Sequence, residues 1–377
     1  MTSRSSLPPV ALVHDYFVQD GGAEAVALEL AAMFPGALVH TTWFERARFG
    51  GRLAPERVRP WALERFLRPS PWFRPLLPAY IANFSRLEVP ASRLVLSNSS
   101  TFARGVRARP PAVHIAYVHA PLRLAWDVDN YLARSSFSTA AKAGLRMGAP
   151  LLRRWDRWAG RRPDVVVANS VNVQRKIRSF WGRDSSVIYP PVNVARSQLS
   201  TAEDGYYLVA TRLLAYKRVE LAIKACARLG RDLVVVGDGP ERAHLERMAG
   251  PRTRFEGHVD KARLEQLLAS CHALIVAGTE DFGMMAVEAM AIGKPVVAFA
   301  AGGALETVID GRTGILFESA TSGGLAAAIE RLESSHLDPA AARERAMAFD
   351  VSVFRARWAA LLAELGLADL AQFADET

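Results

Sequence analysis

The chain has 377 residues, which is too long for one hydrophobic core and suits two domains of ordinary size. Half of the residues are hydrophobic, 23% are charged and the mean hydropathy is +0.06, a globular composition that argues against disorder. The composition also argues against three classes of protein. No apolar run is long enough to span a membrane, and the N-terminus lacks the pattern of a signal peptide. The two cysteines, Cys226 and Cys271, exclude a disulfide framework and argue against a cysteine-based zinc site.

Charge is distributed unevenly along the chain. Residues 1–200 contain 28 Lys and Arg against 13 Asp and Glu, or +15, whereas residues 201–377 contain 19 against 25, or −6. A basic half joined to an acidic half indicates two domains with different partners. Only six of the 47 basic residues are Lys. Arg favours contacts with planar anions and phosphates, although an Arg-rich genome would give the same count.

Short apolar runs alternate with amphipathic stretches along the whole chain. Buried parallel strands are predicted at 9–14, 37–42, 93–97, 113–118, 165–168, 206–210, 232–236, 253–256, 273–276, 295–298 and 314–316. Helices are predicted at 23–33, 172–181, 217–229, 240–248, 261–270, 285–291 and 324–334. This alternation predicts an α/β protein with doubly wound parallel sheets, whose ligands bind at the carboxyl ends of the strands.

The domain boundary is expected after residue 193, because two prolines and a polar stretch precede the strand at 206–210. We therefore predict an N-terminal domain over 1–193, a linker over 194–205 and a C-terminal domain over 206–352. Residues 353–377 are assigned to C-terminal helices that could pack back on the first domain.

Two glycine pairs follow predicted strands. Gly21 and Gly22 open a helix, where backbone N–H groups and the helix dipole favour a phosphate, although glycine pairs are also common at turns. The pair lacks the third glycine of a dinucleotide fingerprint, and the stretch 237–242 has Arg242 at that position. Both departures disfavour a nicotinamide-dependent dehydrogenase.

Two cations lie at the end of the strand at 206–210. Arg212 follows the strand directly and Lys217 opens the next predicted helix. Cations in these places can converge on a diphosphate and neutralise a leaving group. The alternative, a surface Arg and a solvated Lys, fits the sequence equally well.

The stretch 279–295 carries two carboxylates, Glu280 after a buried strand and Glu288 eight residues later. Eight residues span about 800° of an ideal helix, so both side chains are expected on one side, facing one ligand. Carboxylates suit sugar hydroxyls, which need acceptors in fixed directions. Two solvated glutamates on an amphipathic helix are the alternative, which the apolar surroundings disfavour.

In this order the stretches resemble the retaining glycosyltransferases of family 4, and are closest to their bacterial mannosyltransferase-like branch. The signature is Glu280-Asp281-Phe282-Gly283 followed by Glu288. The similarity covers nearly the whole chain, and its other parts are residues 14–15 with 21–24, 117–123, 169–170, 187–192, Arg212 with Lys217, and 302–303 with Glu306.

The resemblance implies a GT-B fold, in which two Rossmann-like doubly wound domains face each other across a cleft. The nucleotide sugar would bind mainly to the C-terminal domain and the acceptor to the N-terminal one. The catalytic residues that it implies are His119, Arg212, Lys217 and Glu280. The donor-binding residues that it implies are Gly21, Gly22, Arg212, Lys217, His258, Val259, Phe282, Gly283, Met284, Met285 and Glu288. The acceptor-side residues are Asp15, Tyr117 and Arg123.

The roles implied by the family are mostly electrostatic. Arg212 and Lys217 would neutralise the diphosphate, Glu280 would hold sugar hydroxyls and Glu288 the ribose. Retention without an enzymic nucleophile fits front-face attack, in which positioning and charge stabilisation supply the catalysis. No metal is expected, because the cations replace it. Asp127 and Asp129 form a DxD pattern, which we interpret as coincidence.

The stretch 117–127 is similar to a branch of the family rich in mannosyltransferases that build bacterial polysaccharides. The resemblance therefore implies GDP-mannose as the donor and a saccharide as the acceptor, lipid-linked if the protein works at a membrane. The alternatives are a UDP-sugar-dependent glycosyltransferase, a sugar-nucleotide epimerase, or a nucleotide-sugar-binding protein without turnover.

A membrane surface is suggested by arginines interleaved with aromatic residues. The main stretch, 57–89, contains Arg57, Arg59, Trp61, Arg65, Phe66, Arg68, Trp72, Phe73, Arg74, Leu76, Leu77, Tyr80 and Arg86. Residues 153–162 form a second such stretch. The alternative is a core-facing aromatic set with solvated arginines. A cytoplasmic protein at the inner face of the plasma membrane is expected, and nucleic acid is ranked far lower because no nucleic-acid module is recognised.

Overall fold

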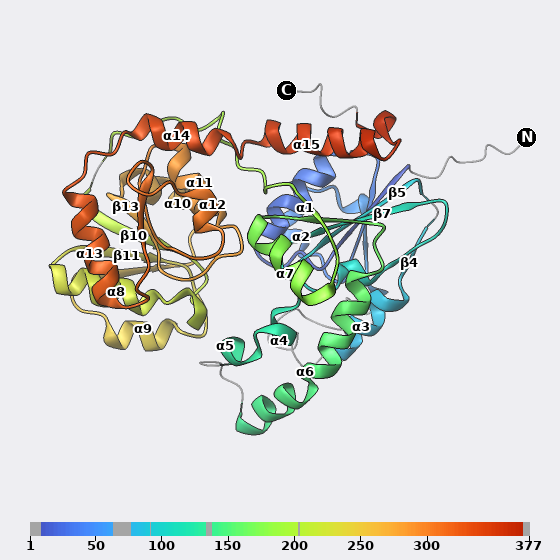
Figure 1. Cartoon of the computed structure of the whole chain (residues 1–377), viewed down its shortest axis with the longest axis horizontal. Coiled ribbons are helices and arrows are strands. Elements are labelled where there is room, and N and C mark those ends of the chain that lie inside the picture. The colour runs from blue at the N-terminus through green and yellow to red at the C-terminus, as the bar shows by residue number, and fades with distance from the viewer. Residues whose placement is uncertain (1–8, 63–76, 91, 133–137, 203, 372–377) are drawn as a thin grey trace, which may run out of the picture. The chain divides into compact units, whose positions relative to one another are not determined.

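The computed structural model of the chain describes residues 9–62, 77–90, 92–132, 138–202 and 204–371. Its contacts divide the chain into two compact units (Figure 1). The first unit comprises Met1–Trp126, Gly148–Pro190 and Phe354–Thr377, and the second comprises Asp127–Met147 and Pro191–Val353. Two helices, α6 (Thr139–Gly160) and α15 (Val351–Glu364), therefore begin in one unit and end in the other. Residues 127–147 cluster with the second unit, although they lie within the sequence range expected for the first domain.

The first unit is built on a parallel sheet in which sequential strands are separated by helices. The strand order is β3-β2-β1-β5-β7-β8-β9, and every neighbouring pair is parallel. The strands are β1 (Val10–His14), β2 (Leu38–Thr41), β3 (Val58–Pro60), β5 (Leu94–Ser99), β7 (Val113–Val118), β8 (Val165–Ala168) and β9 (Ser186–Val187). All five residues of β1 and all six of β5 are buried, as expected for strands covered on both faces.

Helices and short segments complete the first unit. The helices are α1 (Gly22–Met33), α2 (Arg46–Phe49), α3 (Leu77–Arg86), α4 (Arg123–Trp126), α7 (Val171–Trp181) and the larger parts of α6 and α15. A separate two-stranded pair joins β4 (Glu88–Val89) to β6 (Arg107–Ala108). In α15, Phe354, Trp358 and Leu362 are buried in the same apolar cluster as β1, β5 and α1. The last helix therefore completes the core of the unit that contains the first strand.

The second unit repeats this architecture. Its sheet has the order β12-β11-β10-β13-β14-β15, again with only parallel neighbours. The strands are β10 (Tyr206–Ala210), β11 (Asp232–Val236), β12 (Thr253–Gly257), β13 (Ala273–Val276), β14 (Val296–Phe299) and β15 (Gly314–Phe317). The helices are α5 (Val128–Leu132), α8 (Val219–Leu229), α9 (Arg242–Met248), α10 (Lys261–Ser270), α11 (Met284–Ala291), α12 (Ala304–Thr307), α13 (Ser322–Glu333) and α14 (Pro339–Met347).

The predicted doubly wound α/β architecture is confirmed, and the eleven predicted strands lie within about two residues of observed ones, whereas β3, β4, β6 and β9 were not predicted. Helix α8 begins at Val219 and not at Lys217, because residues 215–217 form a 3-10 turn and Arg218 adopts a left-handed backbone with φ 52°. The sequence did not predict α6. Gly144, Gly148 and Pro150 interrupt its pattern, since glycine and proline disfavour helix interiors.

Candidate functional site

The carboxyl edge of the second sheet brings Lys217 and Glu280 together. Lys217 ends the 3-10 turn after β10, and Glu280 lies in the loop after the neighbouring strand β13. The Lys217 Nζ donates a hydrogen bond to Glu280 Oε1, and the two side chains are only 13% and 20% exposed. The sequence placed both residues at this edge, and the structure adds that they form an ion pair.

The loops at this edge approach one another so closely that only glycine fits. A Cβ on Gly278 would lie 2.6 Å from the Lys217 Cα, and one on Gly302 would lie 2.2 Å from the Glu280 carbonyl oxygen. A Cβ on Gly303 would lie 2.2 Å from the carbonyl oxygen of Phe282. The Gly303 N–H also donates to the Glu280 carbonyl oxygen at 2.9 Å. Sequence reasoning missed Gly278, although a glycine directly after a buried strand is a signal of close backbone approach.

Helix α11 begins immediately after this loop. Gly283 precedes it with φ 91°, a left-handed conformation that favours glycine. The backbone N–H groups of Met284 and Met285 lie in its first turn, where the helix dipole favours an anion. Phe282 is buried and packs edge-on against Phe349, so its ring belongs to the core.

The helical argument that related Glu280 to Glu288 was wrong. It assumed one continuous helix, whereas the helix begins only at Met284 and Glu280 lies in the preceding loop. Glu288 is half-buried within α11, and burial raises the pKa of its carboxyl. Two residues of α10 have smaller effects, because Lys261 lowers this pKa and Glu265 raises it. The two carboxylates therefore have different environments, one paired with a cation and the other desolvated.

Three further donor-side candidates follow strands of the same edge. Arg212 is exposed directly after β10. His258, which is exposed, and Val259, which is half-buried, follow β12. The Gly237 N–H donates to the Gly257 carbonyl oxygen at 2.7 Å, which joins the loop after β11 to the end of β12. The sheet order thus separates His258 and Val259 from Lys217 by one strand.

In the first unit, Gly21 and Gly22 begin α1 as the sequence predicts. Gly21 is the N-cap, in an extended conformation, and Glu24 occupies the third helical position. The Glu24 carboxyl lies over Gly21, because a Cβ on Gly21 would be 2.6 Å from Glu24 Oε2. Glu24 is buried, and desolvation raises the pKa of its carboxyl to about 8. The sequence did not predict that a buried carboxyl lies against the glycine pair.

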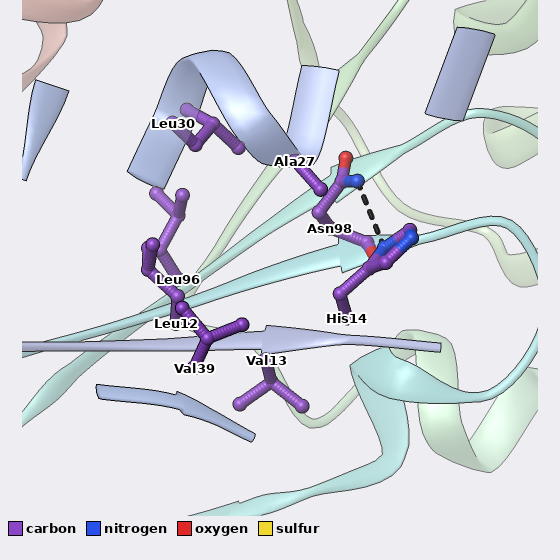
Figure 2. A pocket seen from close by; sticks show the side chains of 8 residues that line it. All are labelled: Leu12, Val13, His14, Ala27, Leu30, Val39, Leu96 and Asn98. Carbon is purple, nitrogen blue, oxygen red and sulfur yellow. Dashed lines mark hydrogen bonds between the residues drawn. The ribbon is translucent and has the colours of Figure 1, made fainter. Parts of the chain in front are cut away.

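Asn98, near the end of β5, connects His14 and His119, two of the four histidines of the first unit. Its Oδ1 lies 2.7 Å from His119 Nε2, and its Nδ2 lies 2.8 Å from the Ala23 carbonyl oxygen. The Nδ2 also lies 3.0 Å from His14 Nδ1 (Figure 2). His119 follows β7 and is half-buried. Sequence reasoning missed Asn98. The polar run 97–100 at the end of a buried strand was the available signal.

A small cavity lies beside His14 and Asn98, between β1, β2, β5 and α1 (Figure 2). Its volume is about 10 Å³, room for about one water molecule and far less than a small-molecule ligand needs. His14 Nε2 is buried and has no hydrogen-bond partner among the described residues. Burial lowers the pKa of His14, partly offset by the neighbouring Asp15 carboxylate, so the ring stays neutral within the core.

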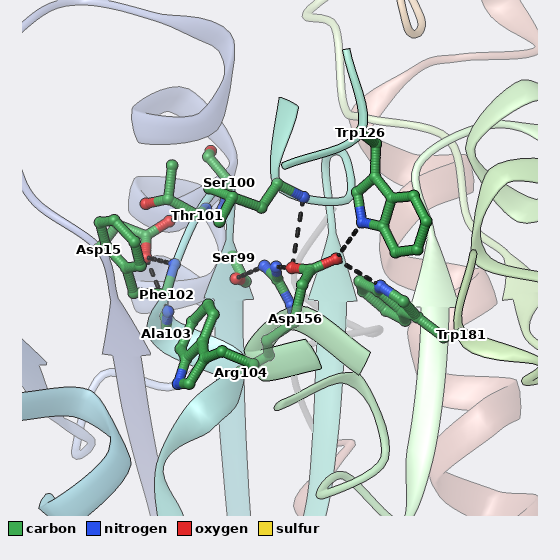
Figure 3. A network of polar contacts seen from close by, with 12 residues as sticks. Asp15, Ser99, Ser100, Thr101, Phe102, Ala103, Arg104, Trp126, Asp156 and Trp181 are labelled. Atoms are coloured by element: carbon green, nitrogen blue, oxygen red, sulfur yellow. Dashed lines mark hydrogen bonds and ion pairs between the residues drawn. The ribbon is translucent and has the colours of Figure 1, made fainter. Parts of the chain in front are cut away.

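Asp15 organises the loop that follows β5. Its two carboxylate oxygens accept hydrogen bonds from four successive backbone N–H groups, those of residues 100–103, at 2.6–2.8 Å (Figure 3). The side chain is 1% exposed. The Asp15 carboxylate therefore holds this loop, and its assignment to the acceptor side stays a prediction.

A buried ion pair supports the segment that contains Arg123. Asp156 of α6 and Arg104 are both fully buried and form a salt bridge (Figure 3). Asp156 Oδ2 also accepts from Trp126 Nε1 at 2.7 Å and from Trp181 Nε1 at 2.6 Å. Because a buried charge is costly without partners, these contacts fix the end of α4 firmly to α6.

The remaining acceptor-side candidates differ in exposure. Tyr117 is completely buried, donates from its hydroxyl to the Ile188 carbonyl oxygen at 2.9 Å and packs against Phe354 and Trp358. Arg123 opens α4 and is half-buried. Tyr117 is thus a core residue under the site, and Arg123 is the accessible member of this set.

The structure also bears on the DxD pattern, on metal binding and on membrane-spanning helices. Asp129 accepts a hydrogen bond from Arg146 Nε at 2.8 Å, and within the described ranges no group of three or more His, Cys, Asp or Glu side chains could hold a metal ion. No helix in the described part of the chain is long and apolar enough to cross a membrane.

In the described part of the 57–89 stretch the aromatic side chains pack inward, whereas Arg59 and Arg86 are exposed. Tyr80 is buried, Trp61 packs on the same apolar cluster, and Arg57 donates to the carbonyl oxygens of Ala31, Phe34 and Ala37. Arg65, Phe66, Arg68, Trp72, Phe73, Arg74 and Leu76 lie outside the described residues.

Comparison with known proteins shows that each half of the chain matches a glycosyltransferase family. The profile of "Glycosyltransferase Family 4" matches residues 20–196, and that of "Glycosyl transferases group 1" matches residues 194–348. The chain belongs to the family 4 glycosyltransferases. The expected resemblance is thereby confirmed, and the motifs at Gly21, Lys217 and Glu280 lie within the matched ranges.

Two curated relatives show how far the similarity extends. Glycogen synthase of Mycobacterium tuberculosis (strain H37Rv) is 32% identical over 265 residues, which are 64% of this chain and 63% of the relative. A GDP-mannose-dependent alpha-mannosyltransferase of Mycolicibacterium smegmatis is 30% identical over 191 residues, 48% of this chain and 51% of the relative. The matched stretches thus span about half to two thirds of these relatives.

Solved structures match over nearly the full length. Anabaena HepE in complex with UDP has a TM-score of 0.67 at 21% identity and covers 94% of this chain and 99% of its own. Sucrose-phosphate synthase from Thermosynechococcus elongatus has a TM-score of 0.69 at 19% identity, covering 96% and 100%. These similarities, together with the two parallel α/β units, establish the GT-B fold.

Proposed function

We propose that this chain is a retaining hexosyltransferase that moves a sugar from a nucleotide-sugar donor to a saccharide acceptor. The observation that carries the proposal is the Lys217–Glu280 pair at the carboxyl edge of β10 and β13, followed directly by the first turn of α11. This arrangement offers a cation and backbone N–H groups to a diphosphate, and a carboxylate to sugar hydroxyls.

The proposed chemistry follows from this arrangement. The bond between the sugar C1 and the diphosphate oxygen breaks, and the acceptor hydroxyl oxygen bonds to C1 on the same face. The acceptor proton passes to the departing phosphate oxygen. Lys217 and Arg212 stabilise the charge that develops on the diphosphate, and Glu280 and Glu288 orient the sugar and the ribose. His119, held by Asn98, hydrogen-bonds the transferring sugar, and no step requires a metal ion.

For the donor we favour GDP-mannose, and for the acceptor a lipid-linked saccharide in bacterial polysaccharide or glycolipid synthesis at the inner face of the plasma membrane. The named activity of the mycolicibacterial relative and the 117–127 stretch support this choice. A UDP-sugar is the second candidate, because Anabaena HepE, whose fold is similar, was solved in complex with UDP-glucose.

Calorimetry with GDP-mannose, UDP-glucose and ADP-glucose tests the donor assignment. We expect GDP-mannose to bind most tightly and Lys217→Ala to weaken binding about 10- to 100-fold, since a hydrogen bond to a charged group contributes about 1.5–3 kcal/mol. Lys224→Ala is the matched control, because Lys224 is exposed on α8 of the same unit. Tighter binding of UDP-glucose would replace the donor, and no binding of any nucleotide sugar would refute the proposal.

A further inference from the structure

One face of α6 presents apolar side chains to solvent. Met147 is 81% exposed, Leu151 73% and Trp158 40%. The spacing of four and seven residues places them, with the exposed Arg154, in one stripe along the helix. The opposite side of α6 is packed, because Ala149, Asp156 and Ala159 are buried. The stripe is therefore a true outer face and not a displaced part of the core.

This face carries two exposed arginines, Arg154 and Arg161, among its apolar side chains. The stretch 139–162 contains a single acidic residue, Asp156, which is fully buried and paired with Arg104. Its basic residues are Lys142, Arg146, Arg153, Arg154, Arg157, Arg161 and Arg162. Arg154, Arg157 and Arg161 are exposed beside Leu151 and Trp158, and Arg162 stacks on the Trp158 ring at 4.7 Å. We call Met147, Leu151, Arg154, Trp158 and Arg161 the outer face of α6.

The chemistry of this face distinguishes between its possible occupants. A second copy of the chain would bring the same arginines against each other, which is unfavourable. Nucleic acid would match the arginines but would leave Met147 and Leu151 in water. The headgroup region of an anionic membrane accommodates both, because arginines meet lipid phosphates while apolar and aromatic side chains enter the acyl boundary.

We propose that the outer face of α6 binds the interface of an anionic lipid membrane. Leu151 and Trp158 enter the acyl boundary, with Met147 one turn before Leu151, and Arg154 and Arg161 contact lipid phosphates. The inference is independent of the donor chemistry and rests on the proposed function only for the lipid-linked acceptor that it would bring within reach. It assigns membrane contact to α6; of the described residues of the 57–89 stretch, Trp61 and Tyr80 pack inward, whereas Arg59 and Arg86 are exposed.

Co-sedimentation of the full chain with vesicles tests this surface without any donor or acceptor. Vesicles of phosphatidylglycerol mixed with phosphatidylcholine are compared with vesicles of phosphatidylcholine alone. We expect binding to the anionic vesicles that weakens as salt shortens the Debye length from about 10 Å to about 3 Å. Leu151→Ser and Trp158→Ser should each lower the partition coefficient about tenfold. Arg154→Gln and Arg161→Gln should each lower it about fivefold.

Two controls in the second unit match these changes. Leu305→Ser alters a leucine that is 56% exposed beside Glu306, and Arg247→Gln alters an exposed arginine of α9. Both should bind anionic vesicles like the unaltered chain. Equal binding by Leu151→Ser and the unaltered chain, or equal loss in Leu305→Ser, would overturn the proposal. So would a dimer seen by analytical ultracentrifugation without lipid that Leu151→Ser dissociates, because a second copy would then occupy the face.

Because vesicle binding is measured without turnover, its failure leaves the donor assignment intact, and failure of nucleotide-sugar binding leaves the membrane surface intact.

Discussion

In the second unit the loops of the candidate site meet backbone to backbone, whereas in the first unit they are joined through buried side chains. Gly278, Gly302 and Gly303 allow the loops around Lys217 and Glu280 to touch. The loop after β5 is held instead by the Asp15 carboxylate, and α4 is held by Asp156. At the donor edge, glycines therefore allow the loops to approach each other closely. In the first unit, the buried carboxylates of Asp15 and Asp156 hold the loop after β5 and helix α4 in place.

The close approach of the loops at the donor edge predicts which glycines of the second unit tolerate a small increase in side-chain volume. Gly303 has an ordinary helical backbone, so alanine is conformationally allowed there, but its Cβ would meet the Phe282 backbone at 2.2–2.5 Å. We expect Gly303→Ala to lower the free energy of unfolding by on the order of 3 kcal/mol. Gly323→Ala in α13, whose Cβ would have no neighbour closer than 3.8 Å, should be neutral or slightly stabilising. Denaturant unfolding of the two variants measures the contrast. A small loss in Gly303→Ala would show that the loops at this edge can separate.

The first unit should respond to pH through Glu24. The folded chain holds the carboxyl proton up to about pH 8, whereas the unfolded chain releases it near its ordinary pKa. The folded state therefore binds more protons between these values, and its stability falls as the pH rises toward 8. Glu24→Gln should remove this slope and raise the free energy of unfolding above about pH 8 by about 5 kcal/mol, because a pKa raised from 4.5 to about 8 is equivalent to that free energy.

Thermal unfolding of Glu24→Gln and the unaltered chain between about pH 5 and pH 9 measures the effect. Glu56→Gln, which changes an exposed carboxyl of the same unit, should retain the slope. A Glu24→Gln variant with an unchanged pH profile would show that the Glu24 carboxyl is ionised in the folded state.

Trp126 and Trp181 donate to the same Asp156 oxygen, so their variants distinguish support of α4 from support of the whole unit. Trp126→Phe and Trp181→Phe each remove one indole N–H from Asp156 Oδ2, but only Trp126 belongs to α4. Each should cost about 1–2 kcal/mol of stability, near the lower end for a hydrogen bond to a charged group. Hydrogen exchange should accelerate in residues 119–126 for Trp126→Phe and stay unchanged there for Trp181→Phe. Equal acceleration in both would mean that Asp156 supports the whole unit without a particular effect on α4.

The sequence predicted most of the fold because its strands are continuous apolar runs with clear turn residues at their ends. It also placed Lys217, Glu280 and Gly283 at one edge, since strand ends in a parallel sheet meet there. It could not predict α6, whose glycines and proline conceal the helical pattern, or the burial of Asp15 and Tyr117, which depends on contacts with distant segments. Asn98 was missed for the same reason, because its partners lie 75–84 residues earlier in the chain and 21 residues later.

The contacts of Asn98 have a consequence for the proton on His119. Because Asn98 Nδ2 faces the Ala23 carbonyl oxygen and must donate to it, the amide oxygen is the atom that faces His119. A neutral His119 must then carry its proton on Nε2, which leaves Nδ1 as a lone-pair acceptor. The start of α1 thereby selects the tautomer of the ring that follows β7, and a sugar hydroxyl that meets this ring would have to donate its hydrogen and not accept one.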